Sequence, residues 1–472
     1  MQISYKFLLL GIILIVAPLS NINAEFSSDL RIIITVTNDI SHGKFLNVVK
    51  NVAKDVAPFF NIFSSVVKLI FGISSTPTDS LELKLLRNLS DTINRRFDQV
   101  DAEFSDVTRL IHWTTSQTVY SDLEAKIHVV SEQFTRIFQV PQSGYNEQKN
   151  LFLHSYETDY LDSGSKLFAA FMFDNGLISK GLIRPAMKYT ENDRGKMRTF
   201  MIGILKLLLV SAKLEIGYLT LKGYDNVIPF YTQQWNNRIG QVQNKMQMVD
   251  LELENIYYSQ SLQDIDRFTL DNVNVDYANF NIYISNRLYD KLSTKYFWRD
   301  WLVIVHEHAR GVYSHSHVCK GIMKTAHGKD IVIDSVQKDK PYLNITVAEL
   351  LYKSLQKTCQ NTAEYIPCAQ VDHCSYPYYS CGGSSTCYDY LTGSRPCRRI
   401  KRCGSYENSK NADTIYSWFS ANAVSCSAFS SLGIMPIGQR AYHAGPTGTG
   451  NSSSRFFLGD LSPCNYKVHF FD

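Results

Sequence analysis

The sequence predicts an α+β protein in which an elongated N-terminal helical bundle is followed by a β-rich, disulfide-bonded C-terminal region. Helical apolar periods dominate residues 40–260, whereas runs of β-branched and aromatic residues begin near residue 270. All ten cysteines lie between Cys319 and Cys464. A chain that gathers every thiol at one end contains one part that is stable without cross-links and another part that needs them.

The first 24 residues predict a secretory signal peptide. Lys6 precedes an apolar segment at residues 7–17, and the small residue Ala24 ends a cleavage context. An uncleaved anchor helix is the alternative, but the apolar segment is shorter than the about 20 residues that span a bilayer. We therefore expect a secreted, extracellular protein. Three triplets match the acceptor pattern for N-linked glycans, at Asn88, Asn344 and Asn451.

Composition and periodicity divide the mature chain into three further parts. We expect a helical bundle domain at 25–265, a β-rich domain at 266–358, and a cysteine-rich disulfide module with a tail at 359–472. The formal net charge of +4 is small for this length and does not indicate a nucleic-acid partner. The 28 tyrosines and 26 phenylalanines suit β-rich modules and interaction surfaces, although aromatic residues first serve cores.

The first predicted helical segment covers residues 44–73. Its second half, from residue 56, carries one charge, Lys68. Because proline lacks an N–H group and clashes with the preceding turn, Pro58 is expected to end or kink one helix and to start another.

Two long segments carry apolar residues every three or four positions, which predicts helices with one seam facing a partner helix. The seam residues are Leu89, Ile93, Phe97, Val100, Phe104, Val107 and Ile111 in the first segment, and Trp235, Ile239, Val242, Met246, Val249, Leu253 and Ile256 in the second. Both seams are expected to form bundle core, with a partner-binding face as the alternative, and the seam at 89–111 could also join two copies in a homo-oligomer.

Residues 199–221 are apolar on nearly every side of the predicted helix. Such a helix lies either at the centre of a bundle or in lipid. Lys206 interrupts the apolar stretch before it reaches spanning length, and this favours a buried central helix.

The C-terminal third changes to shorter elements. Residues 280–284, 301–305 and 329–334 are rich in β-branched and aromatic residues and predict strands. Residues 347–357 predict a short helix that leads to the cysteine-rich segment. We expect every cysteine to form a disulfide, with pairings that spacing does not reveal: Cys319, Cys359, Cys368, Cys374, Cys381, Cys387, Cys397, Cys403, Cys426 and Cys464.

Two His-x-His pairs form a candidate metal site, at His306, His308, His315 and His317. On strands, each pair would place both imidazoles on one face, and four imidazoles can ligate zinc or copper. The alternatives are a pH-sensing role and polar strand ends around a turn at Arg310 and Gly311.

A basic patch lies within the cysteine-rich segment, at Arg395, Arg398, Arg399, Lys401 and Arg402. It predicts contact with sulfated glycans or anionic lipid headgroups, with solvated surface charge as the alternative. The chain contains no nucleophile elbow, phosphate loop or dinucleotide fingerprint. We therefore expect no enzymatic activity and no cofactor, and a metal-dependent enzyme at the histidines is the weaker alternative.

Several short sequence motifs occur in the same order as in a known protein family. They are RFDQVDAEF at 96–104, IHW at 111–113, YSDLE at 120–124, RDWLVIV at 299–305 and CGGSSTC at 381–387. Together with the apolar helix at 56–73, they resemble cephalotoxin-like secreted animal proteins over residues 40–400. The helical half is similar, more distantly, to the bundles of box-jellyfish toxins and insecticidal delta-endotoxins. The resemblance implies a bundle with membrane-inserting potential, a disulfide-bonded end that faces a receptor, and no catalytic residues.

The expected function is therefore that of a secreted, non-enzymatic, membrane-active protein of the pore-forming-toxin type with a C-terminal target-binding region. Its expected partners are membrane lipid or a cell-surface receptor or glycan. The alternative is a secreted binding or matrix glycoprotein that uses the bundle structurally.

Overall fold

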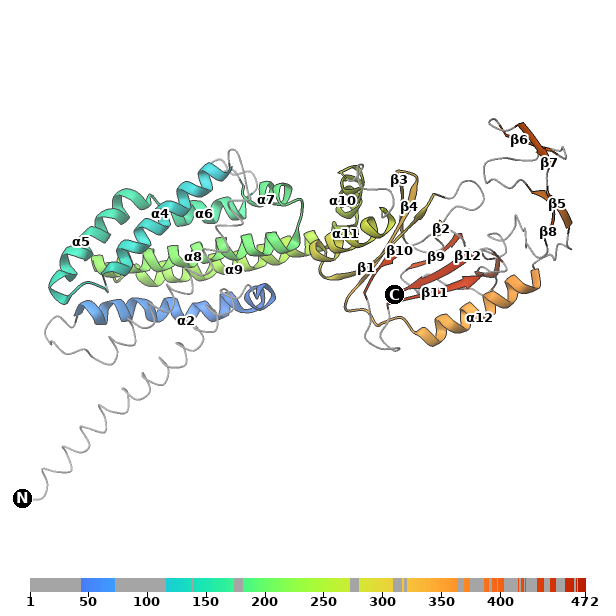
Figure 1. Cartoon of the computed structure of the whole chain (residues 1–472). Coiled ribbons are helices and arrows are strands. Elements are labelled where there is room, and N and C mark those ends of the chain that lie inside the picture. Colours follow the sequence, from blue (N-terminus) through green and yellow to red (C-terminus); the bar gives the residue numbers. More distant parts are fainter. Residues whose placement is uncertain are drawn as a thin grey trace, which may run out of the picture. The chain divides into compact units, whose positions relative to one another are not determined.

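A computed structural model of the chain confirms the predicted order of a helical bundle followed by a β-rich part (Figure 1). It describes residues 44–72, 116–137, 139–173, 181–271, 280–308, 316–317, 321–362, 369–373, 386–389, 393–396, 398–402, 415, 417–419, 421, 431–436, 442–446, 455–461, 464 and 466–472. The chain divides into two compact units, Met1–Gln260 and Ser261–Asp472. The predicted signal peptide and the seam at 89–111 lie outside the described residues.

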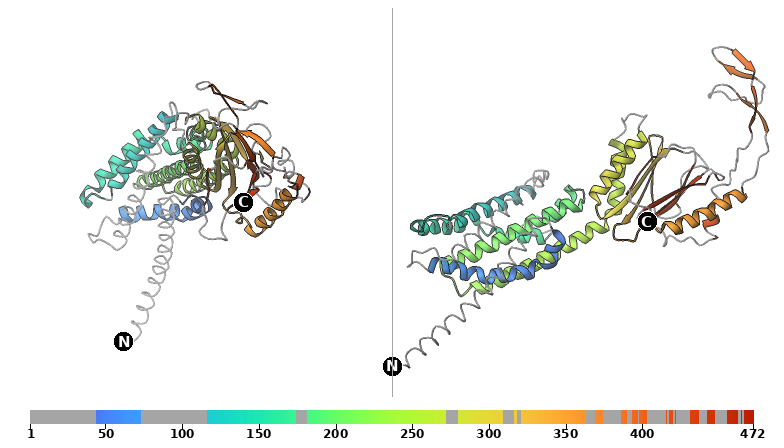
Figure 2. Two further views of the ribbon diagram at one scale, coloured as in Figure 1. Left: turned by 45° about the vertical axis from the view of Figure 1, so that its right-hand side comes forward. Right: turned by 60° about the horizontal axis from the view of Figure 1, so that its bottom comes forward.

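The first unit is a bundle built from α2 (Phe45–Gly72), α4 (Ser116–Arg136), α5 (Tyr145–Ser155), α6 (Ser163–Met172), α7 (Ile183–Tyr189), α8 (Arg194–Lys222) and α9 (Ile228–Asn255). A 3₁₀-helix at Gln142–Gly144 and a π-helix at Tyr156–Tyr160 flank α5. The division between the units falls within α10 (Tyr257–Asp271). Helices α2, α8 and α9 run side by side (Figure 2).

Helix α8 is the central helix of this bundle, as its sequence predicts. From residue 200 to 221 every side chain is buried except Val210, Glu215 and Tyr218, which are half-buried. At Gly217 the neighbouring helix α4 approaches so closely that a Cβ atom would lie 2.8 Å from Cε2 of Phe134. Close packing on all sides explains why this segment is apolar around its whole circumference.

The seam of α9 is confirmed as bundle core. The side chains from Trp235 to Leu253 in this seam are buried, and Ile256 packs against them while partly exposed.

Helix α2 continues through Pro58, so the expectation that a helix ends there is wrong. Its buried residues include Val56 and Phe60 on either side of the proline, within the core shared with α8 and α9. A proline inside a helix costs about 3 kcal/mol. Tertiary packing of the flanking turns offsets this cost, which local sequence rules do not include.

The second unit contains the helices α11 (Phe280–Lys295) and α12 (Ile345–Thr362) and two four-stranded antiparallel sheets. One sheet has the order β10 (Tyr442–Ala444), β1 (Arg299–Glu307), β4 (Lys329–Gln337), β3 (Ile322–Ala326). The other has the order β11 (Phe456–Leu461), β12 (Tyr466–Phe471), β9 (Ser431–Pro436), β2 (Ser316–His317). Two separate two-stranded ribbons pair β5 (Ala369–His373) with β8 (Arg398–Arg402), and β6 (Thr386–Asp389) with β7 (Gly393–Pro396).

The two large sheets pack face to face. Leu302 and Ile304 of β1 share a core with Val332 of β4 and Phe471 of β12. Helix α11 packs against β1 and β10, and α12 packs against β11 on the other side. Strand β1 is thus covered on both faces, which explains why residues 301–305 form a continuous apolar run rather than an alternating one.

The predicted strands at 301–305 and 329–334 and the predicted helix at 347–357 are confirmed. The predicted strand at 280–284 is wrong, because these residues begin α11. Ile284, Leu288, Leu292 and Tyr296 are buried at intervals of four residues. The five-residue window was too short to separate this helical period from a strand pattern.

Candidate functional site: the central helix and its polar contacts

Helix α8 carries two lysines seven residues apart that the fold buries, Lys206 and Lys213. The ammonium of Lys213 lies 5.8 Å from the centre of the Phe134 ring on α4. Burial lowers the pKa of Lys213 to about 8, because a charged amine loses its hydration among apolar side chains. The central helix therefore holds a buried cation that loses its proton near pH 8.

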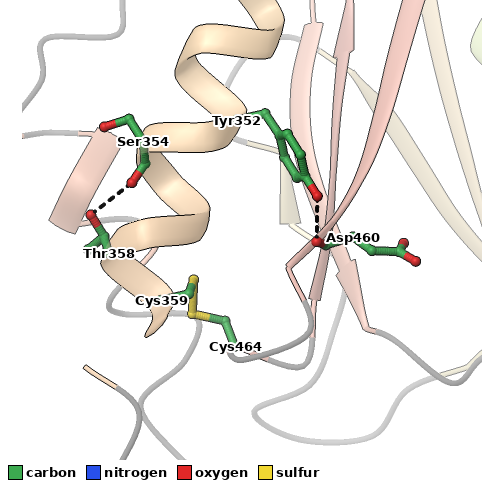
Figure 3. The surroundings of a disulfide bond; sticks show 6 residues. All are labelled: Tyr352, Ser354, Thr358, Cys359, Asp460 and Cys464. Atoms are coloured by element: carbon green, nitrogen blue, oxygen red, sulfur yellow. Dashed lines mark hydrogen bonds between the residues drawn. A yellow bond between two sulfur atoms is a disulfide. The ribbon is translucent and has the colours of Figure 1, made fainter. Parts of the chain in front are cut away.

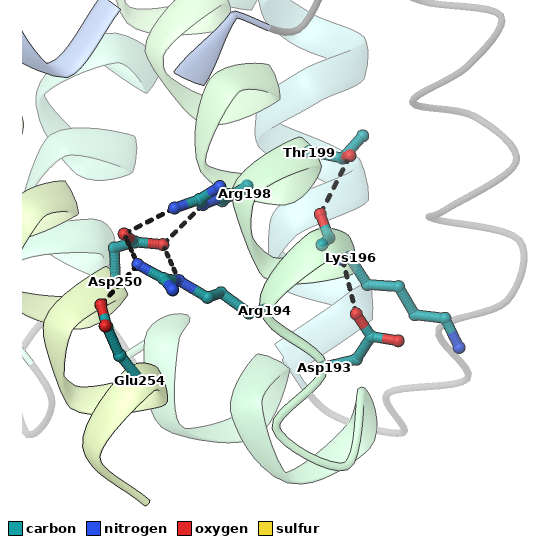
Figure 4. A network of polar contacts seen from close by, with 8 residues as sticks. Asp193, Arg194, Lys196, Arg198, Thr199, Asp250 and Glu254 are labelled. Atoms are coloured by element: carbon teal, nitrogen blue, oxygen red, sulfur yellow. Dashed lines mark hydrogen bonds and ion pairs between the residues drawn. The ribbon is translucent and has the colours of Figure 1, made fainter. Parts of the chain in front are cut away.

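One end of α8 is held to α9 by a network of charged side chains (Figure 4). Arg194 donates two hydrogen bonds to the carboxylate of Asp250, at 2.9 and 2.6 Å, and Arg198 donates two more, at 2.6 and 2.9 Å. Arg194 also pairs with Glu254 at 2.8 Å. We call these four residues the arginine–aspartate network.

The two arginines favour the charged form of the Asp250 carboxylate. Burial alone would raise the pKa of Asp250, but the hydrogen bonds and charges of Arg194 and Arg198 outweigh it and lower that pKa. The guanidinium of Arg198 lies 5.0 Å from the centre of the Phe45 ring, at the start of α2. The network therefore connects three long helices at one end of the bundle.

A second polar cluster surrounds Glu215 of α8. The indole N–H of Trp235 donates to its carboxylate at 2.6 Å, and burial raises the pKa of Glu215. Nearby, the Tyr156 ring stacks on Tyr160, with ring centres 4.7 Å apart, and on Tyr218, with ring centres 4.2 Å apart. Tyr156 and Tyr160 belong to the π-helix, a rare element that often marks functional sites.

Helix α2 contacts its neighbours through a few polar atoms as well as through apolar packing. The hydroxyls of Thr220 on α8 and Ser64 on α2 lie within hydrogen-bond distance, 3.3 Å apart, in a buried position. Gln243 of α9 accepts a hydrogen bond from the backbone N–H of Ala53 at 3.0 Å. Within the parts of the chain that the structure describes, no helix combines the length and apolarity needed to cross a membrane.

The predicted histidine site is distributed over both large sheets. His306 lies buried in β1 and His308 just after it, whereas His317 lies in β2 of the other sheet. His315 lies outside the described residues. The Nδ1 atom of His308 is 2.8 Å from a carboxylate oxygen of Asp330, and burial lowers the pKa of His306. Among the residues with described positions, no group of three or more metal-ligating side chains gathers.

One disulfide is described, between Cys359 at the end of α12 and Cys464 (Figure 3). It fixes α12 against the sheet of β11, where the hydroxyl of Tyr352 also donates to the backbone carbonyl of Asp460 at 2.9 Å. Its two cysteines enclose the cysteine-rich segment. The other cysteines have no described partners, so their pairing stays a prediction.

The structure describes one of the three predicted glycosylation sites and all five residues of the basic patch. Asn344 is exposed, and its side-chain oxygen accepts from the backbone N–H of Val347 at 3.2 Å, at the start of α12. Asn88 and Asn451 lie outside the described residues. Of the basic patch, Arg395 lies in β7 and the other four residues lie in β8.

Sequence reasoning missed the arginine–aspartate network and the Glu215 cluster. A signal for the network was present, because Arg194 and Arg198, like Asp250 and Glu254, are four residues apart and so share one helix face. Nothing in the sequence indicated that these two faces meet.

Comparison with known proteins identifies the helical part. Residues 76–274 match the family model of the Cephalotoxin-like middle helical domain, a range that includes α4 to α10. No curated protein and no solved structure matches the chain. The similarity to box-jellyfish toxins and delta-endotoxins stays a prediction. The resemblance to cephalotoxin-like proteins is confirmed over these residues, and the chain carries a Cephalotoxin-like middle helical domain.

Proposed function

We propose that this chain is a secreted, non-enzymatic, membrane-active protein whose helical unit acts on lipid and whose C-terminal unit binds the target. The observation that carries the proposal is α8, a helix buried around its circumference from residue 200 to 221. The cephalotoxin-like family and the expected signal peptide at residues 1–24 support secretion.

Transfer of the apolar surfaces of α8 and α2 from the bundle to lipid preserves their removal from water. Exposure of the same surface to water would instead cost about 25 cal/mol per Å² of apolar surface. Separation of the helices is opposed by the arginine–aspartate network and by the loss of core packing. Binding of a target by the C-terminal unit is the trigger that we propose for this opening.

The proposal predicts that joining α2 to α8 covalently abolishes membrane permeabilisation. Ser64→Cys combined with Thr220→Cys places two thiols where the hydroxyls are now 3.3 Å apart. The oxidised double variant should release no dye from liposomes, and mild reduction should restore release, because the helices then separate. Leakage of an entrapped fluorophore, across several lipid compositions and pH values, is the measurement.

Wild-type protein under the same oxidising and reducing conditions is the matched control, because it reports the effect of reducing native disulfides. Each single cysteine variant controls for the substitutions. Equal leakage from the oxidised double variant and the wild type would exclude helix separation as the mechanism, and no leakage from the wild type in any condition would refute the membrane-active function.

A second candidate function is polyanion binding by the β5–β8 ribbon, in the manner of an extracellular binding glycoprotein. The strand register places Arg398 and Arg402 on one face, together with His373, whereas Arg399 and Lys401 occupy the other face. Asp372 is the register partner of Arg399, so this second face has one formal negative charge beside its two positive ones. The first face therefore carries the stronger positive charge.

For this function we expect unequal effects of two variants that remove the same charge. Arg398→Ala with Arg402→Ala should lower the salt concentration that elutes the protein from heparin more than Arg399→Ala with Lys401→Ala, because the second pair shares its face with Asp372. Heparin-affinity chromatography is the measurement. Equal retention of both variants and the wild type would argue against any role of the ribbon in polyanion binding.

A further inference from the structure

The turn between α8 and α9 exposes three large apolar side chains, Tyr224, Val227 and Phe230. Their exposed fractions are 51%, 41% and 64%. We call this group the α8–α9 tip. The turn joins the central helix of the bundle to the long helix beside it and lies at one end of the helical unit (Figure 1).

The backbone of the tip is ordered by its own hydrogen bonds. Gly223 adopts a left-handed conformation, with φ of 75°, and closes α8 with bonds from its own N–H to Thr220 and from the Tyr224 N–H to Leu219. The Val227 N–H then donates to the carbonyl of Tyr224 at 3.1 Å. Pro229 fixes the first turn of α9.

The tip also has an inner side. Ile228 is buried, and Tyr231 packs against the bundle core while partly exposed. The fold thus anchors two apolar residues of this turn and leaves the three others in water. Several large apolar side chains exposed together on one ordered turn indicate a surface that contacts a membrane or a partner protein.

The charges around the tip identify the kind of partner. Lys222 forms a partly exposed ion pair with Glu157 at 2.5 Å. Asp225 adds a negative charge. The formal charges of Lys222, Glu157 and Asp225 sum to −1, which gives no preference for anionic lipid and is compatible with a neutral bilayer surface.

We propose that the α8–α9 tip docks into the interface of a zwitterionic lipid bilayer. Tyr224 and Phe230 enter the headgroup region, where tyrosine keeps its hydroxyl in water and its ring in the apolar layer. Val227 enters between them. The helical unit therefore first meets the membrane end-on, through this turn, rather than along the side of a helix. This inference deepens the proposed membrane activity and rests on it.

The test compares two pairs of exposed apolar residues on the full-length protein. Tyr224→Ser with Phe230→Ser removes the tip, whereas Met248→Ser with Leu251→Ser removes apolar surface from the side of α9, where these residues are 67% and 51% exposed. Co-sedimentation with phosphatidylcholine vesicles measures partitioning. Because all four residues are solvent-exposed, thermal melts followed by circular dichroism should be unchanged in both variants.

We expect the tip variant to partition about tenfold more weakly than the wild type, or weaker still, and the α9 variant to stay within about twofold. A larger loss in the α9 variant would show that the bundle lies flat and would overturn the inference. Binding that requires phosphatidylserine would also overturn it, because the tip carries no net positive charge.

Dye leakage measured in parallel separates this inference from the proposed function. If the wild type releases dye and the tip variant binds as well as the wild type does, the tip inference fails and the membrane activity stands. If binding depends on the tip but no dye is released, the docking inference stands and the permeabilising function fails.

Discussion

Replacement of Asp250 by alanine should lower the free energy of unfolding of the helical unit by about 3–5 kcal/mol. The carboxylate of Asp250 accepts four hydrogen bonds from two guanidinium groups, and the guanidinium of Arg194 is itself buried. Without Asp250, Arg194 keeps only its contact with Glu254 among the ion pairs of this network. The buried guanidinium then keeps its desolvation cost while two of its charge-assisted hydrogen bonds, those to Asp250, are lost.

Urea unfolding followed by circular dichroism at 222 nm measures this effect, because the signal comes chiefly from helix. The control is Glu132→Ala, which breaks an exposed ion pair with Arg136 four residues later on α4. That change should cost no more than about 1 kcal/mol, since water screens exposed pairs. A loss below about 1 kcal/mol for Asp250→Ala would mean that the network contributes nothing beyond an ordinary surface pair.

Replacement of Lys213 by methionine should stabilise the helical unit by about 3 kcal/mol at pH 7. Burial lowers the pKa of Lys213 from 10.5 to about 8, and a pKa lower by one corresponds to about 1.4 kcal/mol of free energy. Methionine has a similar length, carries no charge and adapts to irregular apolar surroundings. The expected gain is the removed cost of holding an ammonium group among apolar side chains.

The pH dependence follows from the same lowered pKa. Below about pH 8 the lysine is protonated in both the folded and the unfolded chain, so its cost is constant. Between about pH 8 and 10.5 the folded chain releases the proton first, and the wild type therefore gains stability as pH rises. The difference between the variant and the wild type should disappear near pH 10.5.

Unfolding curves recorded between pH 7 and 11 test this expectation. Lys196→Met on the exposed side of α8 is the matched control and should change stability by less than about 0.5 kcal/mol at every pH. A Lys213→Met variant that is less stable than the wild type at pH 7 would show that the ammonium is well solvated or paired in the folded chain.

The network and the lysine have opposite consequences for opening the bundle. The network holds α8 to α9 through charges that acid does not readily neutralise, because the pKa of Asp250 is lowered. Lys213 weakens the same helix from within. A central helix that is apolar, destabilised by a buried charge and held at one end by ion pairs fits the opening of the bundle that we propose.

The sequence by itself determined the elements whose signal is local and long. The seam from Trp235 to Leu253 and the apolar segment at 199–221 each repeat their pattern over many turns, so their helices and buried faces followed directly. The apolar run at 301–305 likewise predicted a strand. At residues 280–284 the visible pattern was only five residues long, and the prediction failed there.

Only the tertiary structure decided what depends on contacts between distant residues. Arg194 meets Asp250 across 56 positions, Cys359 meets Cys464 across 105, and α2 passes Pro58 because neighbouring helices pack against it. It also decided that Tyr224, Val227 and Phe230 stay in water while Ile228 beside them is buried. The physical reason is that periodicity records which face of an element is apolar, whereas pairing, burial of a charge and exposure of a turn depend on which faces the folded chain brings together.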